Sequence, residues 1–244
     1  MIREDNKNIY IDSFNDITIL KKLKDSRYGS NSNIYFYNDV LLKIYNYKIN
    51  ISELKILENM QKLHLKNVSI PKKIIFIDEM FYGYSMDFKK GNVLNNINPN
   101  IEYNKLISNL NDIEQTIKVF SNKKIEMIDL NCFNILYDEL NNEYNIVDID
   151  SYIKNRLLSI DKIFEDNIYY FSKILLDSIM SSNKQFITDI YRKLDQILKS
   201  NKKSHLLNTF KLIKDVLENY SNREIKTVND FRKVLKKQNN IYKI

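Results

Sequence analysis

The stretch from Glu126 to Tyr152 limits the possible folds of this chain more than any other stretch, because its pattern is that of a β-hairpin. Two apolar runs, Ile135-Leu136-Tyr137 and Tyr144-Asn145-Ile146-Val147, flank the polar, Asn-containing connector 138–143. Short β-prone runs on either side of such a connector are typical of a hairpin. We therefore expect two antiparallel strands here, with their outer ends side by side.

Three polar residues stand at the outer ends of this predicted hairpin. Asp129 and Asn134 precede the first strand, and Asp148 follows the second. The hairpin would bring all three side chains to one end. Two carboxylates and a carboxamide at one point suit a hard cation such as Mg²⁺, with one carboxylate left to accept a hydroxyl proton.

This region resembles the protein kinase family. The segment Met127-Ile128-Asp129-Leu130-Asn131-Cys132-Phe133-Asn134 has the spacing of the catalytic loop H-R-D-L-x-x-x-x-N, and Asp148-Ile149-Asp150 corresponds to D-F-G. The resemblance implies that Asp129 is the catalytic base and that Asn134 and Asp148 hold Mg²⁺. Met127 and Ile128 replace His and Arg of the family pattern, and Asp150 replaces Gly.

A lysine in an apolar strand is the second feature of this kind. Lys43 interrupts Val40-Leu41-Leu42-Lys43-Ile44-Tyr45, which matches the V-A-I-K strand of the family. The resemblance implies that Lys43 holds the α/β-phosphates of ATP and pairs with a Glu on the following helix. Residues 50–63 have helical spacing of apolar residues and offer Glu53 as that partner, with Glu58 as the alternative. The competing interpretation is a surface lysine on an edge strand.

Two weaker segments complete the predicted nucleotide site. The turn 26–33 keeps one glycine of the family's glycine-rich loop, which implies that Gly29, Ser30 and Ser32 approach the phosphates. A plain hairpin turn is the competing interpretation. The segment 83–91 resembles the hinge that binds adenine, which implies a role for Met86 and Phe88.

The order of the predicted elements favours an α+β, bilobal protein kinase-like fold. Residues 1–90 would form a small N-lobe with an antiparallel sheet of five strands, the first at 17–23, and one helix. Gly91 and the Asn-rich segment after it mark the boundary, and residues 91–244 would form a mostly helical C-lobe. Its expected helices are 103–110, 112–120, 166–180, 184–200, 203–219 and 227–238. Asp166 would cap its helix and, by the resemblance, brace the catalytic loop.

Composition limits the other classes of function. The net charge is +7, but lysine is abundant throughout, so we expect a solvated surface rather than a specific nucleic-acid site. A single cysteine excludes a disulfide framework and a cysteine-based zinc site. No run is long enough to span a membrane and the first residues lack the apolar core of a signal peptide, so we expect a cytoplasmic protein.

These observations predict an ATP- and Mg²⁺-dependent phosphotransferase. The segment 149–165 is short and contains no proline, so the A-P-E element of the family is missing. A small atypical Ser/Thr protein kinase with a minimal activation segment is the favoured interpretation. The alternatives are a small-molecule kinase of the aminoglycoside or choline type and a non-catalytic nucleotide-binding scaffold. The expected partners are ATP and a protein or small-molecule phosphoacceptor.

Overall fold

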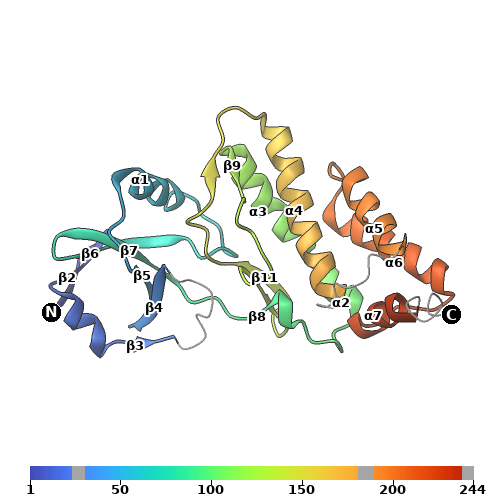
Figure 1. The fold of residues 1–244 in the computed structure, drawn as a ribbon, viewed down its shortest axis with the longest axis horizontal. Helices are drawn as coiled ribbons and strands as arrows, with labels where there is room; N and C mark the ends of the chain where they lie inside the picture. Colours follow the sequence, from blue (N-terminus) through green and yellow to red (C-terminus); the bar gives the residue numbers. More distant parts are fainter. Residues whose placement is uncertain (24–30, 181–188, 238–244) are drawn as a thin grey trace. The chain divides into compact units, whose positions relative to one another are not determined.

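The computed structural model describes residues 1–23, 31–180 and 189–237 and has a mixed α/β fold. The chain divides into two compact units, Met1–Lys89 and Lys90–Ile244. The first unit is built on a seven-stranded sheet, and the second is mainly helical (Figure 1).

The sheet of the first unit has the strand order β1-β2-β6-β7-β5-β4-β3. Its strands are β1 (Ile2–Glu4), β2 (Asn8–Ile11), β3 (Lys21–Lys22), β4 (Ser32–Tyr37), β5 (Val40–Tyr45), β6 (Pro71–Ile77) and β7 (Met80–Asp87). All pairs are antiparallel except β2 with β6, which run parallel. The expected sheet of five antiparallel strands is therefore extended by β1 and β2 on the β6 side.

The first twenty residues differ from the expected single strand at 17–23. A 3-10 helix, η1 (Phe14–Ile19), takes up the first three residues of that range, and only Lys21–Lys22 forms a strand. The turn begins where the Asp16 carboxylate accepts hydrogen bonds from the backbone N–H of Ser13, at 3.1 Å, and from its hydroxyl. This local bonding favours a helical turn over an extended strand, and it directs Ile17 into the core.

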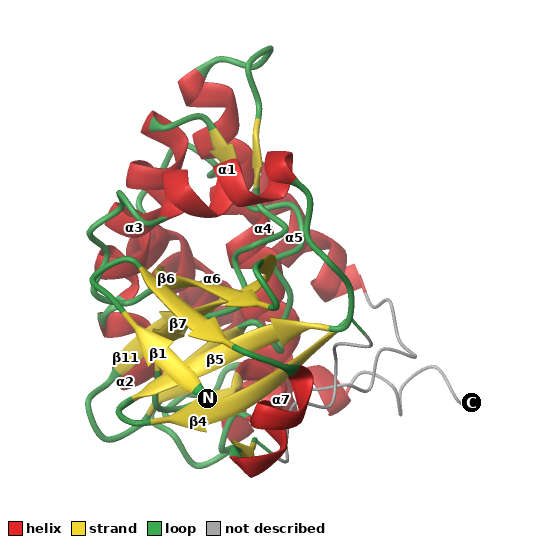
Figure 2. Cartoon of the chain, turned by 90° about the vertical axis from the view of Figure 1, so that its left-hand side faces the viewer, coloured by secondary structure: helices red, strands yellow, loops and turns green. Residues whose placement is uncertain are grey.

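Both faces of the sheet are covered. Leu42 and Ile44 of β5 face the cluster that contains Ile17 of η1. Leu41 and Tyr45 face the opposite cluster, to which the helix α1 (Ile51–Met60) contributes Leu57. Figure 2 shows α1 across this face of the sheet. The alternation along β5 is that of a central strand packed on both sides.

The second unit surrounds one long helix, α4 (Ile160–Met180), which packs against α3, α5, α7 and β9 (Figure 1). The other helices are η2 (Leu94–Asn96), α2 (Tyr103–Ser108), α3 (Leu110–Asn122), α5 (Asp189–Ser200), α6 (Leu206–Ser221) and α7 (Val228–Lys237). The strands are β8 (Asn92–Val93), β9 (Ile125–Glu126), β10 (Ile135–Asp138), β11 (Glu143–Ile146) and β12 (Ile153–Lys154). Every predicted helix of this part is present, although residues 184–188 of the fourth and residue 238 of the last lie outside the described residues. Among the described residues, no helix is long and apolar enough to cross a membrane.

Gly91 has a packing role at the start of the second unit. Its φ is +131°, a conformation that side chains rarely adopt, and a Cβ added to it would lie 2.8 Å from the carbonyl carbon of Tyr137. β8, which follows directly, pairs with β10. The sequence indicated Gly91 as a mark of the boundary, and the structure also packs it closely against the β10 backbone.

Candidate functional site

The candidate site lies in the second unit, at the outer end of the β10–β11 hairpin. The strands pair antiparallel from Ile135 opposite Ile146, as the sequence predicts. Beyond that pair, the backbone N–H of Val147 donates to the carbonyl of Asn134 at 2.9 Å. The hairpin therefore brings Asn134 next to the residue that precedes Asp148.

Asn134 is oriented by the loop that it closes. Its side chain is buried, and its Nδ2 donates to the backbone carbonyl of Asp129 at 3.1 Å. Asn131 donates to the same carbonyl, also at 3.1 Å. These bonds tie the loop through the main chain of Asp129, whose side chain is exposed. The Asn134 amide nitrogen faces the loop, and Oδ1 is the atom with which this side chain could ligate a cation.

Asp148 has a left-handed backbone conformation, with φ of +61°. Such a conformation costs roughly 1–2 kcal/mol for most L-residues and is more easily adopted by Asp and Asn. The next residue, Ile149, is fully buried, and its carbonyl accepts the N–H of Tyr152 at 3.1 Å. Burial of Ile149 and Tyr152 therefore fixes the turn in which the half-buried Asp148 lies.

Tyr152 adds a buried hydroxyl that sequence reasoning did not include in the site. The ring is fully buried against Phe120, with 5.6 Å between ring centroids, and the hydroxyl has no hydrogen-bond partner among the described residues. Burial raises the pKa of Tyr152 well above its ordinary value, and the charges of Asp148 and Asp129 raise it further. The hydroxyl therefore lies within electrostatic range of both carboxylates.

Other buried tyrosines of this unit show how unusual that hydroxyl is. The hydroxyls of Tyr103 and Tyr144 donate to main-chain carbonyls at 2.9 and 2.8 Å, and that of Tyr137 donates to Asn142 at 2.7 Å. Leaving a buried hydroxyl unpaired costs about 1–3 kcal/mol. A water or a ligand at the site would supply Tyr152 with the missing partner. In the sequence, the signal for this buried hydroxyl is an aromatic residue in the polar segment after Asp148.

The brace of the candidate loop is Asn167 and not Asp166. Asn167 is fully buried on α4, its Oδ1 accepts the backbone N–H of Met127 at 3.0 Å, and its Nδ2 donates to the carbonyl of Ile125 at 3.0 Å. The expected helix start at Asp166 is wrong because α4 begins at Ile160. Asp166 is consequently on a partly exposed helix face, where it pairs with Lys162 at 2.8 Å.

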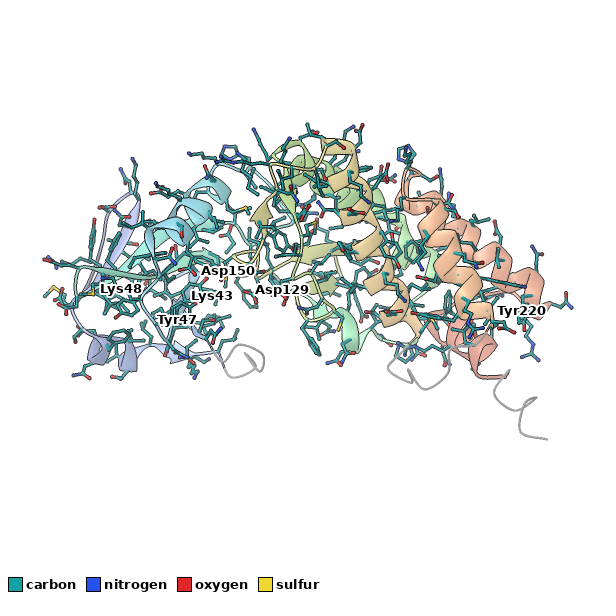
Figure 3. The ribbon with its side chains drawn as sticks, turned by 45° about the horizontal axis from the view of Figure 1, so that its top comes forward. Lys43, Tyr47, Lys48, Asp129, Asp150 and Tyr220 are labelled. Atoms are coloured by element: carbon teal, nitrogen blue, oxygen red, sulfur yellow. The ribbon has the colours of Figure 1, made fainter. Side chains whose placement is uncertain are left out.

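In the first unit, Lys43 is a buried residue of a central strand. Its strand β5 pairs with both β4 and β7, and only 6% of the residue is exposed (Figure 3). The interpretation as a surface lysine on an edge strand is therefore wrong. The ammonium group lies over the rings of Tyr45 and Tyr84, at 5.3 and 5.9 Å from their centroids.

Glu53, the predicted partner of Lys43, caps its own helix. Its carboxylate accepts the backbone N–H of Asn50 at 3.0 Å, and the Asn50 side chain accepts the N–H of Glu53 at 3.0 Å. This reciprocal arrangement is a capping box, which satisfies two backbone donors at the helix N-terminus. The ion pair between Glu53 and Lys43 stays a prediction, and the alternative Glu58 is exposed.

The remaining predicted nucleotide-binding residues are only partly described. Gly29 and Ser30 lie outside the described residues, whereas Ser32 begins β4 and pairs with Tyr45. Met86 is buried on the same sheet face as Lys43. Phe88 is 50% exposed. The structure thus groups Met86 and Lys43 on one face, with Phe88 just beyond the end of β7.

Asn134 and Asp148 carry oxygen donors of the kind that Mg²⁺ binds. Mg²⁺ is usually held by one or two carboxylates and keeps several waters and phosphate oxygens as ligands. Asp148 and Asn134 would supply protein oxygens, and the orphaned hydroxyl of Tyr152 is suited to a hydrogen bond with a bound water. Figure 3 labels Asp129 and the half-buried Asp150 in this unit. Within the described residues, no group of three or more His, Cys, Asp or Glu side chains could hold a metal by itself.

Comparison with protein-family models and with curated proteins gave no match to this chain.

Proposed function

We propose that this protein is an ATP- and Mg²⁺-dependent phosphotransferase. The observation that carries the proposal is the group of polar residues at the hairpin end: Asn134, bonded to the Asp129 main chain, lies beside the Asp148 turn, which also contains the buried Tyr152 hydroxyl. Phosphoryl transfer depends mostly on positioning and on neutralising charge, which such a group can provide.

Each residue has a distinct role in this proposal. Asp129, whose carboxylate is exposed on a loop fixed through its main chain, accepts the proton of the acceptor hydroxyl. Asn134 and Asp148 hold Mg²⁺, which when bound neutralises phosphate charge. Lys43 contacts the phosphates of ATP, and the sheet face that contains Met86 accommodates the base. Asn167 keeps the loop before Asp129 in place through the Met127 N–H.

The acceptor is a hydroxyl of a protein in the favoured version, as in a small Ser/Thr protein kinase. A small-molecule acceptor is the second candidate, and one observation supports it. Because α4 begins at Ile160, the segment between Asp148 and this helix is shorter than the sequence indicates. Ile149 and Tyr152 are buried within it, and Ile153–Lys154 pair with β9, so little of it remains to bind a polypeptide.

The test compares two substitutions that change charge without changing shape. Asp148→Asn should weaken Mg²⁺-dependent ATP binding, measured by titration calorimetry with and without Mg²⁺. Asp129→Asn should leave ATP affinity within about twofold and reduce the rate of γ-phosphate transfer by about 10²–10⁴-fold, because a base acts mainly in the transfer step. Transfer is measured with labelled ATP on protein substrates and on a panel of small hydroxyl compounds.

Asp189→Asn is the matched control, since Asp189 is an exposed carboxylate on α5. It should change neither affinity nor rate. The proposal is refuted if the parent protein binds no ATP at millimolar concentration in the presence of Mg²⁺. Binding without transfer to any acceptor would instead support the scaffold alternative. Equal losses of ATP affinity from Asp148→Asn and Asp129→Asn would contradict the division of roles.

A further inference from the structure

The ammonium group of Lys43 lies over two neighbouring aromatic rings inside the first unit. Its Nζ is 5.3 Å from the ring centroid of Tyr45 and 5.9 Å from that of Tyr84. The two ring centroids are 6.4 Å apart, with 54° between the ring planes. Tyr45 is 7% exposed and Tyr84 is fully buried. The ammonium group therefore has two desolvated aromatic neighbours.

The sheet itself produces this arrangement. Tyr45 is two residues after Lys43 on β5, so both side chains leave the strand on the same face. Tyr84 of β7 is directly opposite Lys43 in the antiparallel register, which places its side chain beside that of the lysine. Neither ring depends on a loop for its position. A change in loop conformation would leave the three side chains together.

The two rings stabilise the charge of a buried lysine. Transfer of an ammonium group out of water is costly unless other groups stabilise the charge. A ring face within about 6 Å attracts a cation through its quadrupole, and the attraction grows when both groups are desolvated. The two tyrosines act on the lysine directly.

We propose that Tyr45 and Tyr84 are positioning residues for Lys43, whose ammonium group they hold on the α1 face of the sheet in a charged, preorganised state. The inference rests on the proposed function only for the consequence, namely tighter binding of ATP phosphates by Lys43. The placement of the Lys43 ammonium group over the rings can be measured without any nucleotide.

The first experiment observes the lysine directly. Protons above an aromatic ring face experience a ring-current shift, so the ε-methylene protons of Lys43 should resonate upfield in the NMR spectrum of the free protein. Tyr84→Phe and Tyr45→Phe keep the ring and should preserve the shift, whereas Tyr84→Leu and Tyr45→Leu should each remove part of it. Lys43→Met identifies the signal. Tyr10→Leu, a substitution on β2 of the same sheet, is the control and should leave the signal unchanged.

The second experiment is a double-mutant cycle on ATP affinity. Loss of one ring should raise the Kd for ATP about 3- to 30-fold when Lys43 is present, the range expected for a cation–π interaction. In a Lys43→Met background the same Tyr→Leu substitution should have no further effect, because the rings act through the lysine. The Tyr→Phe variants should restore the parent Kd. If a tyrosine only packed the core, its substitution by leucine would raise the Kd for ATP equally in the parent and the Lys43→Met backgrounds.

The outcomes separate this inference from the proposed function. An upfield shift that depends on the rings, in a protein that binds no ATP, supports the positioning role and refutes the phosphotransferase. ATP binding with an unshifted lysine signal, or with Tyr→Leu effects that persist in the Lys43→Met background, refutes the positioning role and leaves the phosphotransferase intact. If Tyr84→Leu does not fold, Tyr45→Leu gives the same comparison.

Discussion

Replacing Asn167 by alanine should weaken the second unit more than any exposed substitution, because one side chain satisfies two backbone groups of the candidate loop. Asn167 accepts the N–H of Met127 and donates to the carbonyl of Ile125, both at 3.0 Å. Its Nδ2 is also 3.3 Å from the hydroxyl of Ser121 on α3. Alanine makes none of these bonds, and the full burial of the position keeps water from replacing them.

The magnitude follows from the two backbone groups. Met127 and Ile125 are themselves buried, so each unsatisfied group costs about 1–3 kcal/mol. The free energy of unfolding should therefore fall by about 2–6 kcal/mol in Asn167→Ala. A loss of this size is a large share of the roughly 5–15 kcal/mol that stabilise a typical protein.

Urea unfolding followed by circular dichroism at 222 nm measures this loss, since α2–α7 all belong to the second unit. Amide hydrogen exchange gives a local measure. The Met127 amide should exchange at least about thirtyfold faster in the variant, because 2 kcal/mol corresponds to a factor of about 30.

Asp166→Ala is the matched control on the adjacent position of α4. It removes a partly exposed ion pair with Lys162, which contributes at most about 1 kcal/mol. The control should therefore change stability by less than Asn167→Ala and leave exchange at Met127 unaltered. Equal effects of the two substitutions, or an Asn167→Ala protein with parent stability and parent exchange at Met127, would refute the bracing role.

Two further predictions concern stability. Gly91→Ala should lower the free energy of unfolding by about 1–3 kcal/mol, because φ of +131° and the nearby Tyr137 carbonyl exclude a Cβ; a urea midpoint equal to that of the parent would contradict it. Burial, aided by the charges of Glu139 and Asp138, raises the pKa of Tyr137 to about 12. The folded state therefore keeps a Tyr137 proton that the unfolded chain releases near pH 10. The contribution of this proton to the free energy of unfolding is complete below about pH 10 and is lost as the pH rises towards 12. The urea midpoint of the parent protein should fall as the pH rises from 8 to 11.5, and the fall should be less steep in Tyr137→Phe. A parent midpoint that does not change with pH would contradict this prediction.

The local pattern of the sequence was sufficient for elements whose signals lie within a few residues. The hairpin was predictable because two β-prone runs flank a polar connector, and β10 and β11 pair as expected. The helix α1 was predictable from its apolar spacing, with its N-cap at Asn50. The strand around Lys43 was predictable in the same way. In each case the interactions that form the element are close in sequence, so the periodicity of the chain reports them directly.

Tertiary contacts determined the features that the local sequence pattern could not predict. The parallel pairing of β2 with β6 joins segments more than sixty residues apart, so nothing near β2 specifies it. Asn167 rather than Asp166 braces the loop because α4 begins at Ile160 and turns Asn167 towards β9. The burial of Tyr152, with its hydroxyl near two carboxylates, requires Phe120 of α3 as a neighbour. Similarly, Lys43 is beside Tyr84 only through the register of β5 with β7. Sequence periodicity determines which residues share a face of one element, whereas packing between distant elements determines which side chains meet.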